Sequence, residues 1–446
     1  MGYFIMGMQL LLSLSILVTL HEFGHYWTAK KFGMRVEKFY LFFDAGFSLY
    51  KKKIGETEYG IGWLPLGGYV KISGMIDESM DREAMAQAPQ PWEFRSKPAW
   101  QRLIVMIGGV TVNFLLGIFL FAMLSWIYGD KYLPTENAIY GISVSGLATE
   151  MGLQDGDKVL AVGDEPFDKF NSGVVTAKML LDQVFELTIE RDGEKMTLVV
   201  PDSTVVKLTK YSKKKIRLFE PRIPFVAGDV KEKMPAKAAG FQKEDSIVAC
   251  NGIPTPFFND FLKIVSKQKD QDINIDYYRK GTLYSTVVHT TKEGQVGIAP
   301  YGPNRYFELD TIHYGLFESF PVAVGKSYDF LANQVTAFGQ MFSGRIKAQD
   351  SLGGFISIGK MFPPYWDWEY FWRMTAILSL ILGFMNLLPI PALDGGHVLF
   401  LLFEIVARRP VNEKVLEYAQ VAGIILLLLL LLFANGLDIY GLIFPS

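Results

Sequence analysis

The first stretch of the chain that could carry out chemistry reads HEFGH and spans residues 21–25. His21 and His25 stand four positions apart, and Glu22 follows the first of them. Residues at positions i and i+4 share one helix face, so both imidazoles can bind one metal ion with the carboxylate beside it. A catalytic zinc takes three protein ligands and keeps one position open for water. The motif therefore predicts a metal-dependent hydrolase in which Glu22 is the general base.

A third ligand must come from elsewhere, and the stretch NLLPIPALDGGH offers Asp394. This aspartate and His21 each follow a long apolar run. Ionisable groups at membrane depth are costly and are functional by default, so we predict that Asp394 completes the metal site. His397 stands three positions later and suits a partner of a ligand. For the remaining histidines, His289 and His313, we expect surface or packing roles.

Four apolar runs without a charged residue are long enough to cross a membrane, whose core of about 30 Å needs about 20 helical residues. They span residues 4–20, 103–128, 374–393 and 418–437. Basic residues flank one end of these runs: Lys30, Lys31, Arg35, Lys97, Arg102, Arg408 and Arg409. Short basic loops stay in the cytoplasm, so we expect both chain ends and the region 129–370 outside. His21 and Asp394 would then lie at a similar depth on the cytoplasmic side.

The composition agrees with a membrane protein. Of the 446 residues, 50% are hydrophobic and 20% are charged, unlike an ordinary soluble enzyme. The formal net charge of −2 argues against a nucleic-acid partner. Cys250 is the single cysteine, which excludes an intrachain disulfide.

HEFGH in the first apolar run, together with NLLPIPALDGGH in the third, resembles the site-2 protease family of intramembrane zinc metalloproteases. The order of elements, with two outside modules between the second and third runs, is similar to that of bacterial members. The resemblance implies one Zn²⁺ bound by His21, His25 and Asp394, with Glu22 activating the water.

The resemblance also implies substrate-binding segments. The family segment that holds the substrate beside the metal matches Asn386, Pro389 and Pro391. The family's membrane-associated hairpin resembles residues 59–75, YGIGWLPLGGYVKISGM, which include Gly67 and Gly68. An extended substrate could pair with the edge of such a strand. A simple proline kink and an ordinary hairpin are the alternatives for these two segments.

Two positions depart from the family pattern. The stretch GGVTVN contains the expected Asn113, but Val110 stands where relatives usually carry proline. Phe355 likewise replaces a proline. We interpret both as variation in packing and gating.

The outside region contains an internal repeat, because GLQDGDKVLAVGDEP begins at Gly152 and GFQKEDSIVACNGIP at Gly240. Each copy resembles the core of a PDZ domain, a sheet-and-helix module that accepts peptide ends or extended strands. We place the two modules at residues 129–218 and 219–310, followed by an amphipathic and interfacial linker at 311–372. In the family such a pair is thought to act as a size filter that excludes bulky substrates.

The predicted fold is a polytopic α-helical membrane protein with four transmembrane helices, a membrane-associated β-hairpin or sheet at 35–75 and two tandem extracytoplasmic PDZ-like α+β modules. The membrane core would comprise residues 1–128 and 373–446. We interpret the chain as an intramembrane zinc endopeptidase of a bacterial inner membrane. By resemblance, its substrates are single-span membrane proteins of the anti-sigma-factor type after a first outside cut, and remnant signal peptides. Membrane lipid and a peptide ligand of the modules are further expected partners.

Two other classes of protein compete with this interpretation. A membrane metal transporter would also place histidines and an aspartate in the membrane, but it needs neither a general base nor outside peptide-binding modules. A membrane scaffold would explain the modules without explaining the metal ligands.

Overall fold

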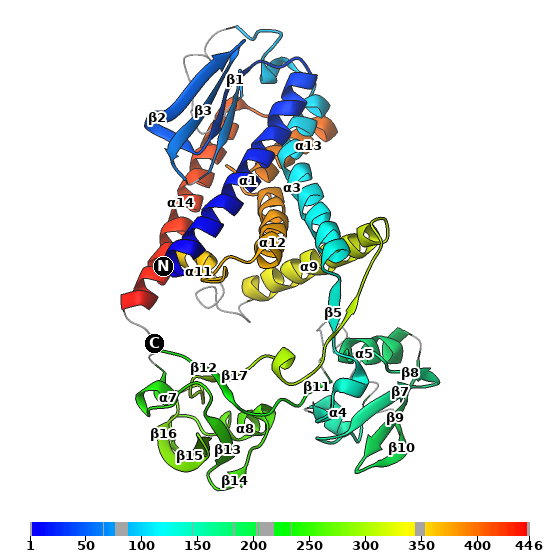
Figure 1. Ribbon diagram of the computed structural model, residues 1–446. Coiled ribbons are helices and arrows are strands. Elements are labelled where there is room, and N and C mark those ends of the chain that lie inside the picture. Colours follow the sequence, from blue (N-terminus) through cyan, green and yellow to red (C-terminus); the bar gives the residue numbers. More distant parts are fainter. Residues whose placement is uncertain are drawn as a thin grey trace. The chain divides into compact units, whose positions relative to one another are not determined.

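Long apolar helices form the framework that carries the histidines. The computed structural model describes residues 2–65, 67–75, 88–144, 146–181, 183–201, 204, 218–232, 234–343 and 353–443. The chain divides into two units, Met1–Gly129 with His313–Pro445, and Asp130–Ile312. In the described part of the first unit, four helices are long and apolar enough to cross a membrane: α1 (Gly2–Lys31), α3 (Ala99–Ile127), α12 (Trp368–Leu387) and α14 (Glu413–Ile443). The expectation of four apolar helices is thus confirmed (Figure 1).

Buried polar side chains join these helices across the bundle. The hydroxyls of Ser13 in α1 and Thr375 in α12 lie 3.0 Å apart, and Ser379 of α12 donates to the carbonyl oxygen of Asn113 in α3 at 2.7 Å. Such hydrogen bonds between apolar helices satisfy polar groups that lipid could not. They hold α12 against both α1 and α3.

The predicted third run, 374–393, is helical only as far as Leu387. A non-helical segment, 388–393, follows, and a new helix, α13 (Asp394–Ala407), begins at the predicted ligand itself. Leu388 adopts an extended conformation with ψ of 142° because the residue before a proline avoids the helical region. The two prolines of this segment therefore end α12 and set the start of α13.

A four-stranded sheet follows α1, with strands β1 (Val36–Leu41), β2 (Phe43–Ile54), β3 (Thr57–Leu64) and β4 (Tyr69–Ile72) in the order β2-β3-β1-β4. The predicted hairpin at 59–75 is wrong in its pairing, since β3 and β4 are separated by β1. β3 runs parallel to β1 and forms its hairpin with β2. Buried Tyr40 of β1, which packs against Gly60 of β3 and stacks on Tyr69 of β4, explains why β1 lies between them. β4 thus becomes an edge strand, and within the described ranges its outer edge carries no paired strand.

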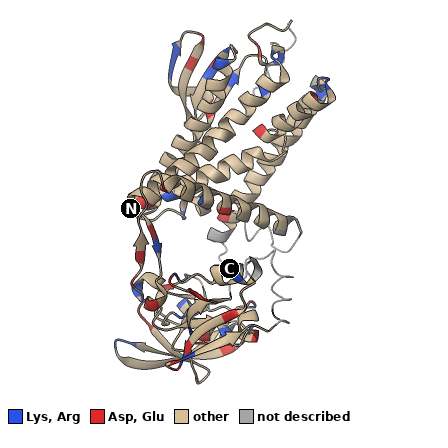
Figure 2. Ribbon diagram, turned by 90° about the vertical axis from the view of Figure 1, so that its right-hand side faces the viewer, with Lys and Arg blue, Asp and Glu red and all other residues tan. Residues whose placement is uncertain are grey.

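Charged side chains are sparse along the helices of the first unit. Figure 2 shows Lys and Arg gathered at the end of the bundle where the four-stranded sheet lies. The helix α9 (Ser319–Phe342), within the predicted linker, packs on α3, and Lys326 donates to the hydroxyl of Ser125 at 2.8 Å. The short helix α11 (Phe355–Gly359) is bound at its N-terminus by Asp438 of α14, which accepts from the backbone N–H of Ser357 at 2.9 Å.

The second unit contains the same α+β arrangement twice. The first copy comprises β6 (Ile142–Val144), α4 (Leu147–Glu150), β7 (Lys158–Val162), β8 (Glu165–Pro166), α5 (Ser172–Leu181), β9 (Glu186–Arg191), β10 (Glu194–Val199) and β11 (Phe219–Pro221). The second comprises β12 (Ala227–Val230), α7 (Pro235–Ala238), β13 (Ser246–Cys250), β14 (Ile253–Pro254), α8 (Phe258–Val265), β15 (Asp272–Arg279), β16 (Thr282–His289) and β17 (Ile298–Pro300). The sheets have matching strand orders, β10-β9-β7-β8 and β16-β15-β13-β14.

The predicted boundary between the two copies at 218/219 is misplaced. β11 pairs with β6, so that Phe219 stands opposite Val144 and belongs to the core of the first copy. The core of the second copy begins at Phe225. The strand that closes each copy comes last in the chain, and a boundary drawn from the repeated motif alone cuts it off. At the ends of the unit, β5 (Asp130–Tyr132) pairs with β18 (Asp310–Ile312).

Each copy holds its repeated turn with a buried ion pair. Arg191 donates to both carboxylate oxygens of Asp157 at 2.7 Å, and Arg279 donates to those of Asp245 at 2.7 and 2.6 Å. The Asp245 side chain is fully buried and also accepts from the backbone N–H of Gln242. Because the carboxylate is buried, loss of its bidentate partner would leave an uncompensated charge and cost far more than loss of a surface pair.

Replacing Arg279 by leucine should lower the local free energy of unfolding of the second copy by roughly 2–3 kcal/mol, since Asp245 would lose its counter-charge. Hydrogen exchange of peptides from β13 and β15 in the full chain measures this change. Arg305→Leu is the matched control, because Arg305 forms a bidentate pair with the exposed Glu244 and should leave the exchange unchanged. Equal loss of protection in both variants would contradict the structural role of the buried pair.

Candidate metal centre

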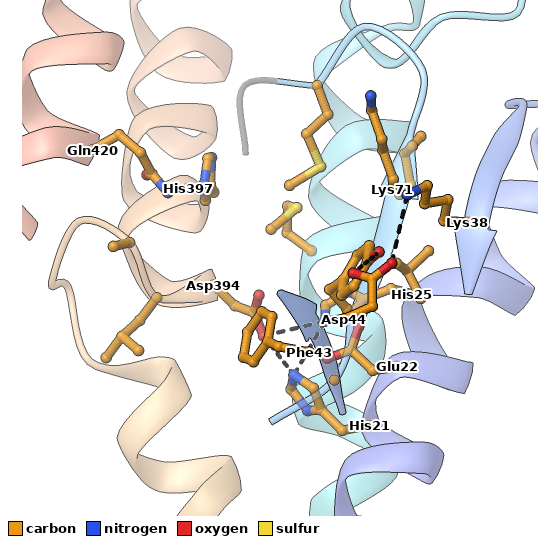
Figure 3. A pocket seen from close by; sticks show the side chains of 18 of the residues that line it. His21, Glu22, His25, Lys38, Phe43, Asp44, Lys71, Asp394, His397 and Gln420 are labelled. Atoms are coloured by element: carbon orange, nitrogen blue, oxygen red, sulfur yellow. Dashed lines mark hydrogen bonds and ion pairs between the residues drawn. The ribbon is translucent and has the colours of Figure 1, made fainter. Parts of the chain in front are cut away.

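The structure brings the three predicted ligands together from two helices far apart in the chain. His21 and His25 extend from one face of α1, and Asp394 extends from the first turn of α13 (Figure 3). The two Nε2 atoms lie 3.3 Å apart, and each lies 3.3 Å from Oδ2 of Asp394. The histidines are 7% exposed, so this cluster is withdrawn from bulk solvent.

The cluster fits one tetrahedral metal ion. Zinc bonds of 2.0–2.1 Å to nitrogen and oxygen place neighbouring tetrahedral ligands about 3.3–3.4 Å apart, the edge length of this triangle. Oδ2 of Asp394 is buried and has no hydrogen-bond partner among the described residues. A buried carboxylate oxygen in that state is destabilising unless a cation binds it. Two imidazole nitrogens and one carboxylate oxygen also form a donor set that suits zinc.

The outer nitrogens of both imidazoles contact α3. Nδ1 of His25 lies 2.8 Å from the carbonyl oxygen of Val105, and Nδ1 of His21 lies 3.0 Å from the side-chain amide of Asn113. Contacts of this kind orient a ligating histidine and direct its other nitrogen toward the metal. Both Nε2 atoms are thereby left for the cluster.

Glycines allow α3 to lie this close to α1. A Cβ on Gly24 would overlap the carbonyl of Gly108, and a Cβ on Gly109 would overlap Nε2 of His25 and lie 2.7 Å from Cε1 of His21. Gly24, Gly108 and Gly109 were not among the functional residues predicted from the sequence. The sequence signal for them was glycine inside an apolar helical run, in HEFGH and GGVTVN. Glycine destabilises a helix, so its presence there indicates a close packing contact.

Glu22 lies in the wall of a cavity of about 610 Å³ that also contains the metal ligands. Val70 of β4 lines the same cavity. Gly68, just before β4, lines the same cavity, and a Cβ there would stand 3.4 Å from Cγ of Glu22 and 2.7 Å from Val18. The general-base candidate and the edge strand therefore meet in one cavity.

The other predicted substrate-binding residues divide into two groups. Asn386, at the end of α12, places Nδ2 3.2 Å from Nε2 of His21, within the cluster. Pro389 and Pro391 lie in the segment between α12 and α13, where Pro391 borders a neighbouring cavity of about 220 Å³. Gly67 has φ of +150°, and a Cβ there would lie 3.1 Å from the ring of Phe43. Gly67 is not among the described residues that line the larger cavity.

His397 lines both cavities, and Figure 3 places it near Gln420, away from the three ligands. Within the described ranges the metal-ligand group contains His21, His25 and Asp394 without it. His397 lies one helical turn after Asp394, as expected from the sequence, and its side chain faces the cavity.

Replacing Gly109 by alanine should weaken metal binding at least about tenfold, because the added methyl would displace the imidazoles. Zinc titration against a competing chelator in detergent measures the change. Gly7→Ala in α1 is the matched control, since a Cβ there meets no atom within 4 Å. Unchanged zinc affinity in Gly109→Ala would show that α3 does not shape the site.

Comparison with known proteins agrees with this geometry. Residues 9–430 match the model of Peptidase family M50. The chain is 31% identical to the Escherichia coli K12 protein named regulator of sigma-E protease RseP, over 94% of this chain and 95% of that one. It is 30% identical to a regulator of sigma E protease of Haemophilus influenzae, over 95% and 96%. A putative zinc metalloprotease of Vibrio cholerae is 30% identical over 93% of both chains. With nearly its whole length matched, this chain belongs to Peptidase family M50 and is a membrane-associated peptidase of that family.

Proposed function

We propose that the chain is an intramembrane zinc endopeptidase that cleaves single-span membrane proteins near the cytoplasmic side of a bacterial inner membrane. The observation that carries this proposal is the triangle of two imidazole nitrogens and one carboxylate oxygen with 3.3 Å edges, held between apolar helices. Membership of a peptidase family and the name of the Vibrio cholerae relative support zinc as the metal.

In this mechanism His21, His25 and Asp394 hold the metal and Glu22 moves the proton. Bound zinc supplies Lewis-acid activation of a water molecule and of the scissile carbonyl. Glu22 accepts a proton from the attacking water and returns it to the leaving amine. Asn386 is placed to donate a hydrogen bond from its amide to the carbonyl oxygen of the substrate.

The edge of β4 is the proposed docking strand for the substrate. A peptide bond in a helix is shielded, whereas an extended segment can add to a free strand edge by backbone hydrogen bonds. Tyr69, Val70 and Lys71 each stand opposite a residue of β1, and all three line the cavity that contains the general-base candidate. Because Gly68 has no Cβ, the backbone before β4 packs closely against Val18 and the carbonyl of Tyr40, beside the general-base candidate. The turn at Gly67 sets the start of the strand. Pro389 and Pro391 shape the segment whose Ala392 and Leu393 line the same cavity.

The substrate class follows from the relatives and from the second unit. Relatives named regulators of sigma-E protease support an anti-sigma-factor-type substrate that a first protease has already shortened. The two α+β copies of residues 130–312 act as PDZ-like modules that exclude bulky outside domains or bind a peptide end. Remnant signal peptides meet the same size limit. Basic residues gather at the sheet end of the bundle, which supports an orientation with that end in the cytoplasm and both termini outside.

The transporter and scaffold alternatives have less support. A transporter gives no account of a general-base carboxylate beside an edge strand, and a scaffold gives none of a buried metal-ligand triangle. The family assignment also favours the peptidase.

Replacing Glu22 by glutamine should keep one zinc bound and lower cleavage of a truncated single-span substrate by about 10²–10⁴-fold, because the proton acceptor is lost. Asp394→Ala should lose both the metal and the cleavage. Zinc content and cleavage are measured side by side in detergent. His289→Ala, a histidine in the second unit, is the control that should keep both. Cleavage by the Glu22→Gln variant at the normal rate would remove Glu22 from the proposed role.

If the substrate adds as a strand to β4, every second backbone N–H group of the substrate should point toward β4. N-methylation of a synthetic substrate at one alternate set of backbone nitrogens should lower kcat/KM about fivefold for each hydrogen bond lost, at about 1 kcal/mol apiece. Methylation at the other set, which faces away from β4, should have little effect. The two methylated series control for each other, and equal effects in both would argue against an added strand.

A further inference from the structure

One face of α3 contacts both metal-ligating imidazoles at regular spacing. Val105, Gly109 and Asn113 lie at positions i, i+4 and i+8, so they form a single strip along the helix. Val105 contacts His25, Asn113 contacts His21, and Gly109 makes room for both rings. The three positions therefore act on the metal site as one surface.

We propose that Asn113 is a positioning residue that holds His21 in the tautomer with its proton on Nδ1, so that Nε2 is free to bind the metal. This inference rests on the proposed metal site and extends it. Asn113 is not itself a ligand and lies on the outer side of the imidazole.

The chemistry of the imidazole determines what Asn113 must provide. A neutral histidine that binds metal through Nε2 carries a proton on Nδ1, and that proton needs an acceptor. The side-chain amide of Asn113 lies 3.0 Å from Nδ1 and is completely buried. Its two ends have the same shape, so the oxygen can face Nδ1 as readily as the nitrogen. Placing Oδ1 there supplies the acceptor.

The state of the amide oxygen supports that orientation. With Nδ2 facing His21, Oδ1 of Asn113 is buried and has no hydrogen-bond partner among the described residues. Turning the amide pairs this oxygen with the N–H group of Nδ1 and moves the amide N–H groups to the place of the oxygen, so the proton on Nδ1 decides the orientation. Binding of metal at Nε2 fixes that N–H on Nδ1 and thereby favours the turned amide.

The backbone of Asn113 is held independently of its side chain. Ser379 of α12 donates to the carbonyl oxygen of Asn113 at 2.7 Å. This contact fixes the residue along the axis of α3, and it leaves the side-chain amide to serve His21. The two contacts can therefore be removed separately.

The test compares Asn113→Leu with Asn113→Asp in the full chain in detergent. Leucine removes the acceptor but keeps the branch at Cγ, and we expect zinc affinity, measured with a competing chelator, to fall about 10–100-fold. Aspartate restores an acceptor, and we expect affinity within about threefold of the parent, since a carboxylate partner raises the basicity of a ligating histidine. A residue that only packed would give the opposite order, because a buried charge is more disruptive than leucine.

Two further measurements separate the possible failures. Ser379→Ala removes the backbone contact alone and should leave zinc affinity unchanged. The chain contains five histidines, so ¹⁵N-histidine NMR of the zinc-loaded protein can report whether His21 carries its proton on Nδ1. That signal should persist in Asn113→Asp and weaken in Asn113→Leu.

The outcomes are distinguishable. Parent-like affinity in Asn113→Leu, or equal losses in the leucine and aspartate variants, would overturn the role of Asn113 while leaving the metal site intact. If Asp394→Ala binds zinc as the parent does, the proposed metal site itself is wrong. Loss in leucine and rescue in aspartate, with Asp394→Ala unable to bind, supports both.

Discussion

The contact on which the site depends is the close approach of α1 and α3 at Gly24 and Gly108, where backbone meets backbone. In an apolar surrounding the hydrophobic effect does little to hold helices together, so close packing and interhelical hydrogen bonds must do it. A side chain at either glycine would push the helices apart. The carbonyl of Val105 and the amide of Asn113 would then no longer reach the imidazoles. The same contact therefore packs the bundle and orients the ligands.

The opposite wall of the site is made of irregular backbone, which lipid does not tolerate unless it is buried or lines a cavity. The segment 388–393 meets this condition because it packs beneath α14, where a Cβ on Gly423 would overlap the carbonyl of Pro391. The break lets α13 begin at Asp394, so this ligand enters from a helix start while the histidines enter from a helix interior. Two different local structures thus converge on one point.

Much of the site could be predicted from sequence because its chemistry is local. His21, Glu22 and His25 share one helix. Asp394 could be linked to them because it and His21 each follow an apolar run that ends at a similar membrane depth. The contacts of Gly109 and Asn113 could not be predicted in the same way, because they depend on the rotation of α3 about its axis. The predicted hairpin at 59–75 was wrong for a related reason. Adjacency in the chain favoured pairing of β3 with β4, but β1, which carries the buried Tyr40, lies between them. The boundary at 218/219 failed because β11 returns to pair with β6.

The two histidines obtain their outer partners in different ways, and the spacing on α3 explains the difference. A helix carbonyl is normally covered by the side chain four positions later, and Gly109 leaves the carbonyl of Val105 open to His25. The next carbonyl on that face belongs to Gly109 and is covered by Asn113, so His21 meets a side chain there instead of the backbone. One glycine can expose one carbonyl; a second glycine at 113 would expose another at a further cost in helix stability of about 1 kcal/mol relative to alanine. An amide at 113 provides the acceptor and keeps the helix intact, which makes His21 the ligand whose orientation depends on a replaceable side chain.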